Sequence, residues 1–152
     1  MKRILVSLAI VVLSTLSARA TEAFDFRSGD PVEFLALLRK SKGFVTVEGT
    51  YREWPARKDM PALVALIRSE EDCAHVVSAS SSHLPTKRAT VGELVVYLIE
   101  SFRLGRFPSS LSSDRPVGSD HSLEERRRDI EKWYLTQKGF VKPARDNARD
   151  VP

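Results

Sequence analysis

The stretch TVGELVVYLIESF, residues Thr90–Phe102, decides the fold. Thr90 and Glu93 have the spacing of a capping box, in which two side chains satisfy the first backbone N–H groups of a helix. Apolar residues follow at helical spacing, and Gly105 is placed to end the helix. Since apolar residues also occupy the flank, we expect this helix in the centre of a domain, covered by several neighbours.

Three further segments on either side of this stretch carry helix signals. The first spans about 31–42, with Asp30 as a carboxylate cap and proline at the first helical position. The second spans about 61–70, where Asp59 can cap. The third begins at a serine capping box and spans about 122–138. The predicted fold class is therefore mainly α, a small bundle of about four to five helices.

The helix predicted over 122–138 is highly charged and has a thin apolar stripe. We expect it to lie on the surface and to dock through Trp133 and Tyr134. Oppositely charged residues three or four apart can pair along the helix, so a solvated face is favoured over a binding patch. The residues expected in water are Arg126, Arg127, Arg128, Asp129 and Lys132.

Two segments do not have a helical pattern. Residues 45–52 alternate apolar and polar side chains, which is typical of a strand, and 74–79 is the candidate partner. Together they predict one minor β-hairpin. Residues 107–121 are rich in proline, serine and aspartate, and we expect a long surface loop there.

The start of the chain has the pattern of an export signal. Two basic residues precede an apolar run, and the small residues ending at Ala20 form a cleavage site. We therefore expect 1–20 to be a signal peptide cleaved near Ala20, and the mature protein to lie in the periplasm or to be secreted, without membrane insertion. The remaining chain divides into one helical domain, 21–140, and a disordered polar tail, 141–152.

The charge balance argues against nucleic-acid binding. The chain has 24 Lys and Arg against 20 Asp and Glu. Three of the basic residues, Lys2, Arg3 and Arg19, leave with the signal, so the mature chain is close to neutral. A chain of this kind lacks the positive field that gathers phosphate backbones.

The only cluster of candidate metal ligands consists of Glu70, Glu71, Asp72, Cys73, His75 and His83. Cys-x-His is not the spacing of a closed zinc site, and the same pair has no third group to orient it as a nucleophile and base. We therefore assign no catalytic, cofactor-binding or metal-binding residue. Cys73 is the only cysteine, and we expect it to be buried, with pairing between molecules as the alternative. Trp54 is expected in the core.

Parts of the second half of the chain carry a resemblance to known proteins. The segments concerned are Leu63 to Cys73, Leu84-Pro85, Thr90 to Glu93, Ile99-Glu100 and Ile130 to Tyr134. They resemble small exported helical proteins of bacteria that are loosely related to HEAT-like repeats. The resemblance implies stacked helix pairs that offer a face to another protein, with no catalytic residues. The chain has no repeat of about forty residues, which a solenoid would need.

These observations favour an exported, non-catalytic protein-binding domain, of the class of periplasmic immunity or inhibitor proteins, with another envelope or periplasmic protein as its partner. The loop 107–121 is the expected contact region, and we expect deletion of 109–119 to remove binding while leaving the fold intact. One alternative is a metal- or thiol-dependent periplasmic enzyme that uses Cys73 and His75. Another is a structural envelope protein without a dedicated ligand.

Overall fold

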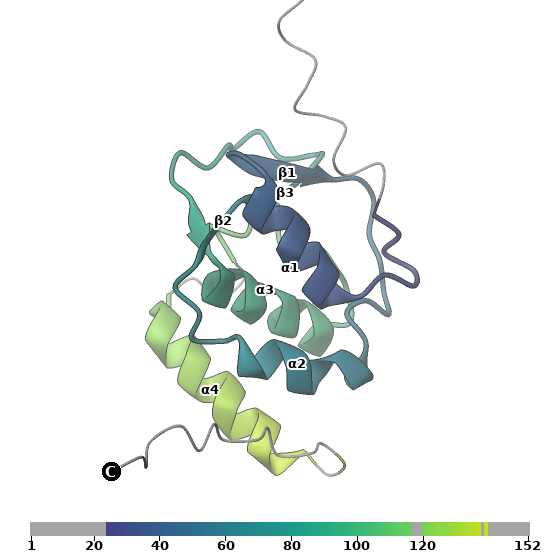
Figure 1. The fold of residues 1–152 in the computed structure, drawn as a ribbon, viewed down its shortest axis with the longest axis vertical. Coiled ribbons are helices and arrows are strands. Elements are labelled where there is room, and N and C mark those ends of the chain that lie inside the picture. The colour runs from purple at the N-terminus through teal and green to yellow at the C-terminus, as the bar shows by residue number, and fades with distance from the viewer. Residues whose placement is uncertain (1–23, 117–119, 138, 140–152) are drawn as a thin grey trace, which may run out of the picture.

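The computed structural model describes residues 24–116, 120–137 and 139. The predicted signal peptide (1–20) and most of the predicted tail (141–152) therefore lie outside the described residues. None of the described helices is long and apolar enough to cross a lipid bilayer. In chain order the elements are α1 (Pro31–Lys40), β1 (Phe44–Val47), a 3-10 turn η1 (Arg57–Asp59), α2 (Met60–Ala65), β2 (Asp72–Cys73), β3 (His75–Ser78), β4 (Ala89–Thr90), α3 (Val91–Arg103) and α4 (Leu123–Thr136) (Figure 1).

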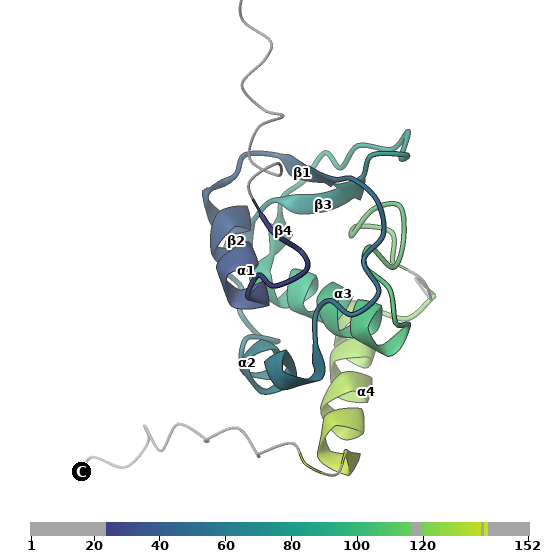
Figure 2. The same cartoon turned by 90° about the vertical axis from the view of Figure 1, so that its right-hand side faces the viewer.

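Helix α3 lies at the centre, as its sequence predicts, and contacts α1, α2 and α4 (Figure 2). Its capping box is formed: the Thr90 backbone N–H donates to Glu93 Oε2 at 2.6 Å, and the Glu93 N–H donates to Thr90 Oγ1 at 3.3 Å. Gly105, with φ of +67°, follows the end of the helix. Nine residues of α3 are buried: Val91, Gly92, Leu94, Val95, Val96, Tyr97, Leu98, Ile99 and Ser101.

The other predicted helices are present, but α2 is shorter than expected. Asp30 caps α1 by accepting from the Val32 N–H at 2.8 Å, which confirms the predicted start. Helix α2 ends at Ala65, and turns follow it. Asp59 does not cap α2, because its carboxylate accepts from the Ala56 N–H of the preceding 3-10 turn at 2.8 Å.

The predicted hairpin is wrong in its strand direction. Strand β1 does pair with β3, but the two run parallel, in register from Phe44 opposite His75 to Val47 opposite Ser78. Parallel strands need a crossover connection, and here the chain passes through α2 between them. A second, two-residue antiparallel pair joins β2 to β4. The described chain is thus largely helical but mixed α/β rather than a pure helical bundle.

The segment predicted as a surface loop is partly built into the fold. Phe107 is fully buried, and it exchanges two backbone hydrogen bonds of 2.7 Å with Tyr51. Further on, Ser112 bridges to Val77, so this segment lies along β3 as a short antiparallel neighbour. Deleting 109–119 would also remove the buried side chains of Ser109 and Ser112. This burial argues against the expectation that the deletion spares the fold.

An aromatic cluster fills the core on the side of α1. Trp54 is 4% exposed and its ring centroid lies 4.6 Å from that of Phe107 and 4.9 Å from that of Phe26. The Trp54 indole N–H donates to the Gly29 carbonyl at 2.8 Å, so its polar atom is satisfied. This arrangement confirms Trp54 as a core residue.

Helix α4 docks through ion pairs as well as through its apolar stripe. Ile130 and Tyr134 are buried, as the thin stripe predicts. The Arg126 and Arg127 side chains are only 13% and 9% exposed, however, and they reach Glu100 and Glu70 on other segments. The prediction that both arginines lie in water is wrong, because neighbouring segments cover their side chains and supply a carboxylate to each.

Candidate functional site

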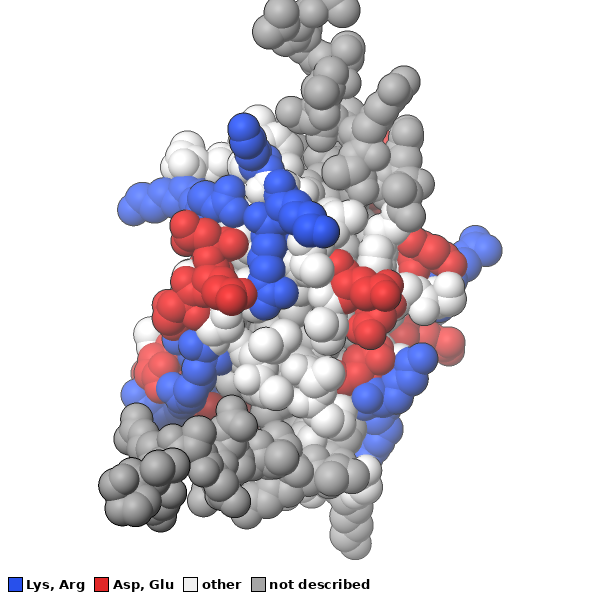
Figure 3. All heavy atoms as spheres, in the orientation of Figure 1, with Lys and Arg blue, Asp and Glu red and all other residues white. Residues whose placement is uncertain are grey.

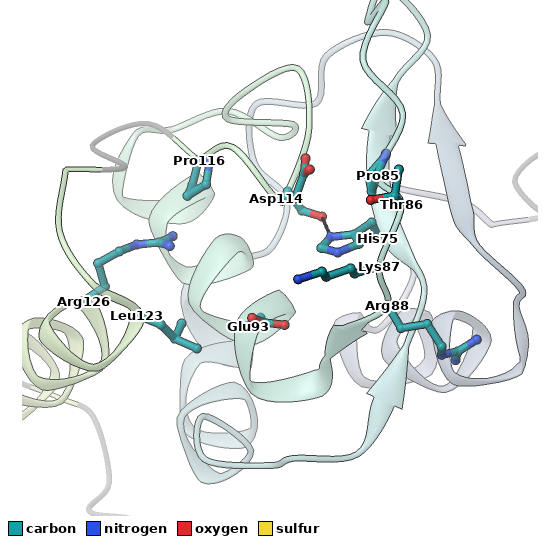
Figure 4. A pocket seen from close by; sticks show the side chains of 11 residues that line it. His75, Pro85, Thr86, Lys87, Arg88, Glu93, Asp114, Pro116, Leu123 and Arg126 are labelled. Atoms are coloured by element: carbon teal, nitrogen blue, oxygen red, sulfur yellow. Dashed lines mark hydrogen bonds between the residues drawn. The ribbon is translucent and has the colours of Figure 1, made fainter.

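A pocket of about 300 Å³ lies where β3, the start of α3, the segment 113–116 and the start of α4 meet (Figure 4). The segment between β3 and β4 closes its remaining side. The side chains that give the pocket its chemistry are His75, Lys87, Glu93, Ser113, Asp114 and Arg126. Figure 4 shows that the labelled groups among them come to one site from distant parts of the chain.

His75 forms the buried wall of the pocket. His75 is 7% exposed, and its Nδ1 lies 2.9 Å from Ser113 Oγ. The same hydroxyl accepts the Val76 N–H at 3.0 Å, so we assign its proton to the bond with Nδ1, which leaves the ring hydrogen on Nε2. Burial lowers the pKa of His75, which keeps the ring neutral at pH 7.

Asp114 and His83 join the two segments that flank the pocket. His83 Nε2 lies 2.7 Å from Asp114 Oδ2, and Ser112 Oγ donates to the other carboxylate oxygen. Burial opposes ionisation of Asp114, but the hydrogen bonds from Ser112 and His83 outweigh it and lower the pKa of this carboxyl. The resulting contact ties residues 79–88 to residues 109–116, and we call these two segments together the loop face.

The loop face carries two large apolar side chains in contact with solvent. Leu84 is 53% exposed and Leu111 is 58% exposed. The Leu111 carbonyl accepts the Ser78 N–H at 2.8 Å, so its backbone is fixed to the end of β3. The His83–Asp114 contact holds the other segment beside it. Two exposed leucines are therefore presented on segments with fixed positions.

The residues considered as candidate metal ligands do not form a common site. Cys73 is fully buried, which confirms the expected burial, and burial raises the pKa of its thiol to about 12. Glu70 reaches Arg127 at 3.2 Å, and Glu71 reaches Arg39 at 2.7 Å. Within the described residues, no group of three or more His, Cys, Asp and Glu side chains could hold a metal ion.

Sequence reasoning identified His75 and His83 as notable but missed the residues that accompany them. Lys87, Asp114 and Arg126 lie in three separate segments, and no local pattern marks them as partners of His75. The polar composition of 107–121 was the one available signal for Asp114. Comparisons of the chain with protein-family models, with curated proteins and with solved structures find no match.

Proposed function

We propose that this protein is an exported, non-catalytic protein-binding domain that binds another envelope or periplasmic protein through the loop face. The observation that supports this most directly is the pair of exposed leucines, Leu84 and Leu111, on two segments joined by the His83–Asp114 contact. An immunity or inhibitor protein is the class that fits a small domain of this kind.

Rigid presentation is the physical reason for choosing this face. Association costs free energy when side chains and loops must be ordered, so segments already held in place lose less on binding. Single exposed apolar residues are common on protein surfaces, but two on joined segments can be covered together by one partner. The polar groups around them supply the rim of such an interface.

The charge distribution agrees with a protein partner. On the face of α1 and α2, basic side chains lie beside acidic ones, with uncharged surface between them (Figure 3). This face therefore lacks the continuous positive field expected of a surface that binds nucleic acid.

The enzyme alternative with Cys73 and His75 has less support. A nucleophilic cysteine needs a lowered pKa and access to substrate, whereas the Cys73 thiol is fully buried with its pKa raised to about 12. His75 points to the pocket, which Cys73 does not line. The structural alternative, an envelope protein without a dedicated ligand, predicts that no partner depends on the loop face.

The test compares capture of periplasmic proteins by immobilised mature protein and by two variants. The double variant Leu84→Ser, Leu111→Ser changes the loop face. The control variant Leu135→Ser changes another exposed leucine (69%), which lies in the last turn of α4 and is not part of the loop face. We expect mass spectrometry to identify a partner that the native protein and Leu135→Ser retain and the double variant loses. Equal capture by all three proteins refutes the loop face as the binding surface.

The proposed compartment is tested separately. The mass of the mature protein, purified from the periplasm, is expected to correspond to a chain that begins at Thr21. An intact mass that includes residues 1–20, or recovery of the protein in the cytosolic fraction, contradicts export.

A further inference from the structure

The pocket in Figure 4 contains hydrogen-bond donors that the protein itself does not use. Lys87 has no hydrogen bond or ion pair with any described residue. Arg126 directs Nε and Nη2 to Glu100, which leaves Nη1 unused. His75 uses Nδ1 on Ser113 and leaves Nε2, although the residue is more than nine-tenths buried. Three donor groups therefore face the same small space without a protein acceptor.

The acceptors in the pocket are mostly occupied. Both carboxylate oxygens of Asp114 already accept, one from Ser112 and the other in contact with His83. Glu93 uses Oε2 on the Thr90 N–H and has Oε1 left. The unused donors thus outnumber the unused carboxylate oxygens, and the pocket is suited to a ligand that brings acceptors.

The start of α3 does not account for this preference, because its first N–H groups are already bound. The Val91 N–H donates to the Glu71 carbonyl at 2.8 Å, and the Gly92 N–H donates to the Ser69 carbonyl at 2.9 Å. The Glu93 N–H is satisfied by the Thr90 hydroxyl. Any affinity for an anion must therefore come from the side chains.

We propose that this pocket binds a small oxyanion, a carboxylate or a phosphate, with Lys87 as its main cation and with Arg126 Nη1 and His75 Nε2 as further donors. Lys87 is the main cation because the charge of Arg126 is shared with Glu100, and because Arg88 is directed away from the pocket and donates Nη1 to the Ser41 carbonyl (Figure 4). A volume of about 300 Å³ lies at the lower end of the range for small-molecule pockets, which suits a small anion rather than an extended chain. Charge-assisted hydrogen bonds of this kind are stronger than neutral ones. The pocket shares Lys87, Ser113 and Asp114 with the loop face, but anion binding does not depend on the proposed function, because it does not require a protein partner.

The test is a titration of the mature protein followed by ¹H–¹⁵N NMR spectra, in a buffer without phosphate or carboxylate. Sodium phosphate, sodium acetate and sodium chloride are added separately at matched ionic strength. We expect phosphate, acetate or both to give saturable shifts at the amides of Lys87, Glu93 and Ser113, and chloride to give none. Shifts that follow ionic strength alone, equally with chloride, overturn the proposal.

Matched lysine variants test the assigned role of Lys87. Both Lys87 and Lys58 are exposed, but Lys58 lies in the 3-10 turn and does not line the pocket. We expect Lys87→Gln to weaken anion binding by about tenfold or more, because one charge-assisted hydrogen bond is lost. We expect Lys58→Gln to leave anion binding unchanged. Circular dichroism of both variants checks that they are folded. Unchanged affinity in folded Lys87→Gln contradicts the assignment.

Discussion

Replacing Gly92 by alanine tests how α3 is seated in the core. Gly92 lies in the first turn of α3, where the turn that follows α2 passes close to the helix. A Cβ at this position would lie 2.6 Å from the Ile67 carbonyl oxygen, 2.8 Å from the Ser69 carbonyl oxygen and 2.7 Å from Arg127 Nη2. The arginine end can move, but the two backbone oxygens can move only if the turn shifts.

Two opposing effects set the size of the change. Alanine is favoured over glycine inside a helix by about 1 kcal/mol, so helix propensity alone predicts a gain in stability. Overpacking a closed site costs about 1–3 kcal/mol, and here two of the three close contacts are with backbone. Because backbone contacts relax least, we expect a cost in the upper part of this range, about 2–3 kcal/mol. The net loss in the free energy of unfolding is then about 1–2 kcal/mol, and Tm is expected to fall by about 4 °C or more.

Thermal and urea unfolding of residues 21–152, followed by circular dichroism, measures this loss. Gly105→Ala is the matched control, because nothing lies within 4 Å of its added Cβ, and its expected loss of about 1 kcal/mol comes from the positive φ alone. Adding Arg127→Met to Gly92→Ala is expected to restore little, since the carbonyl contacts remain. A Gly92→Ala protein as stable as the native one, or more stable, refutes the close seating of α3 against this turn.

Three further predictions concern the ionisable groups. Arg126→Ala is expected to lower the free energy of unfolding by about 2 kcal/mol, because Glu100, with a side chain 17% exposed, loses its partner. A double-mutant cycle with Glu100→Gln checks this, and a coupling no larger than that of the more exposed pair Arg103–Asp129 contradicts it. The Cys73 thiol, with its pKa raised to about 12, is expected to react with a disulfide reagent at pH 8 only after denaturation, and prompt labelling of the folded protein argues against its burial. Burial lowers the pKa of His75 below 6.5 in the folded protein, so as the pH falls His75 is protonated in the unfolded chain before it is protonated in the folded one. The contribution of His75 to the free energy of unfolding is therefore complete above about pH 6.5 and declines as the pH falls below that value. Urea unfolding at pH 5 and pH 7 is expected to show this decline in the native protein and a smaller one in His75→Gln.

The helices with local signals could be predicted well from the sequence. The capping boxes at Thr90 and Ser122 and the Asp30 cap each satisfy backbone groups within a few residues, so the sequence contains the whole interaction. The end of α2 could not be predicted in this way. The turn after Ala65 is joined to the start of α3 by hydrogen bonds from the Val91 and Gly92 N–H groups, which are distant in sequence.

The direction of the β1–β3 pair and the burial of Arg126 also depend on contacts between residues that are distant in sequence, so neither could be predicted from local patterns. Alternation over residues 45–52 indicates a strand but contains no information on whether its partner runs parallel or antiparallel. The local sequence predicts Arg126 as a surface residue, because its partner Glu100 lies on another helix and is distant in sequence. The pocket had the least local signal, since Lys87 and Asp114 meet His75 only after three separate segments have packed.

The parallel pairing of β1 with β3 limits the order in which the chain can acquire structure. A hairpin can close soon after its second strand is synthesised, but β1 must wait until the chain through α2 has been made and folded back. Until then its inward-facing Val45 and Val47 lack the strand that flanks them in the finished domain. A fragment that stops before His75 therefore leaves the edge of β1 unpaired and its valines uncovered. We expect truncated products of this length to associate or to be degraded.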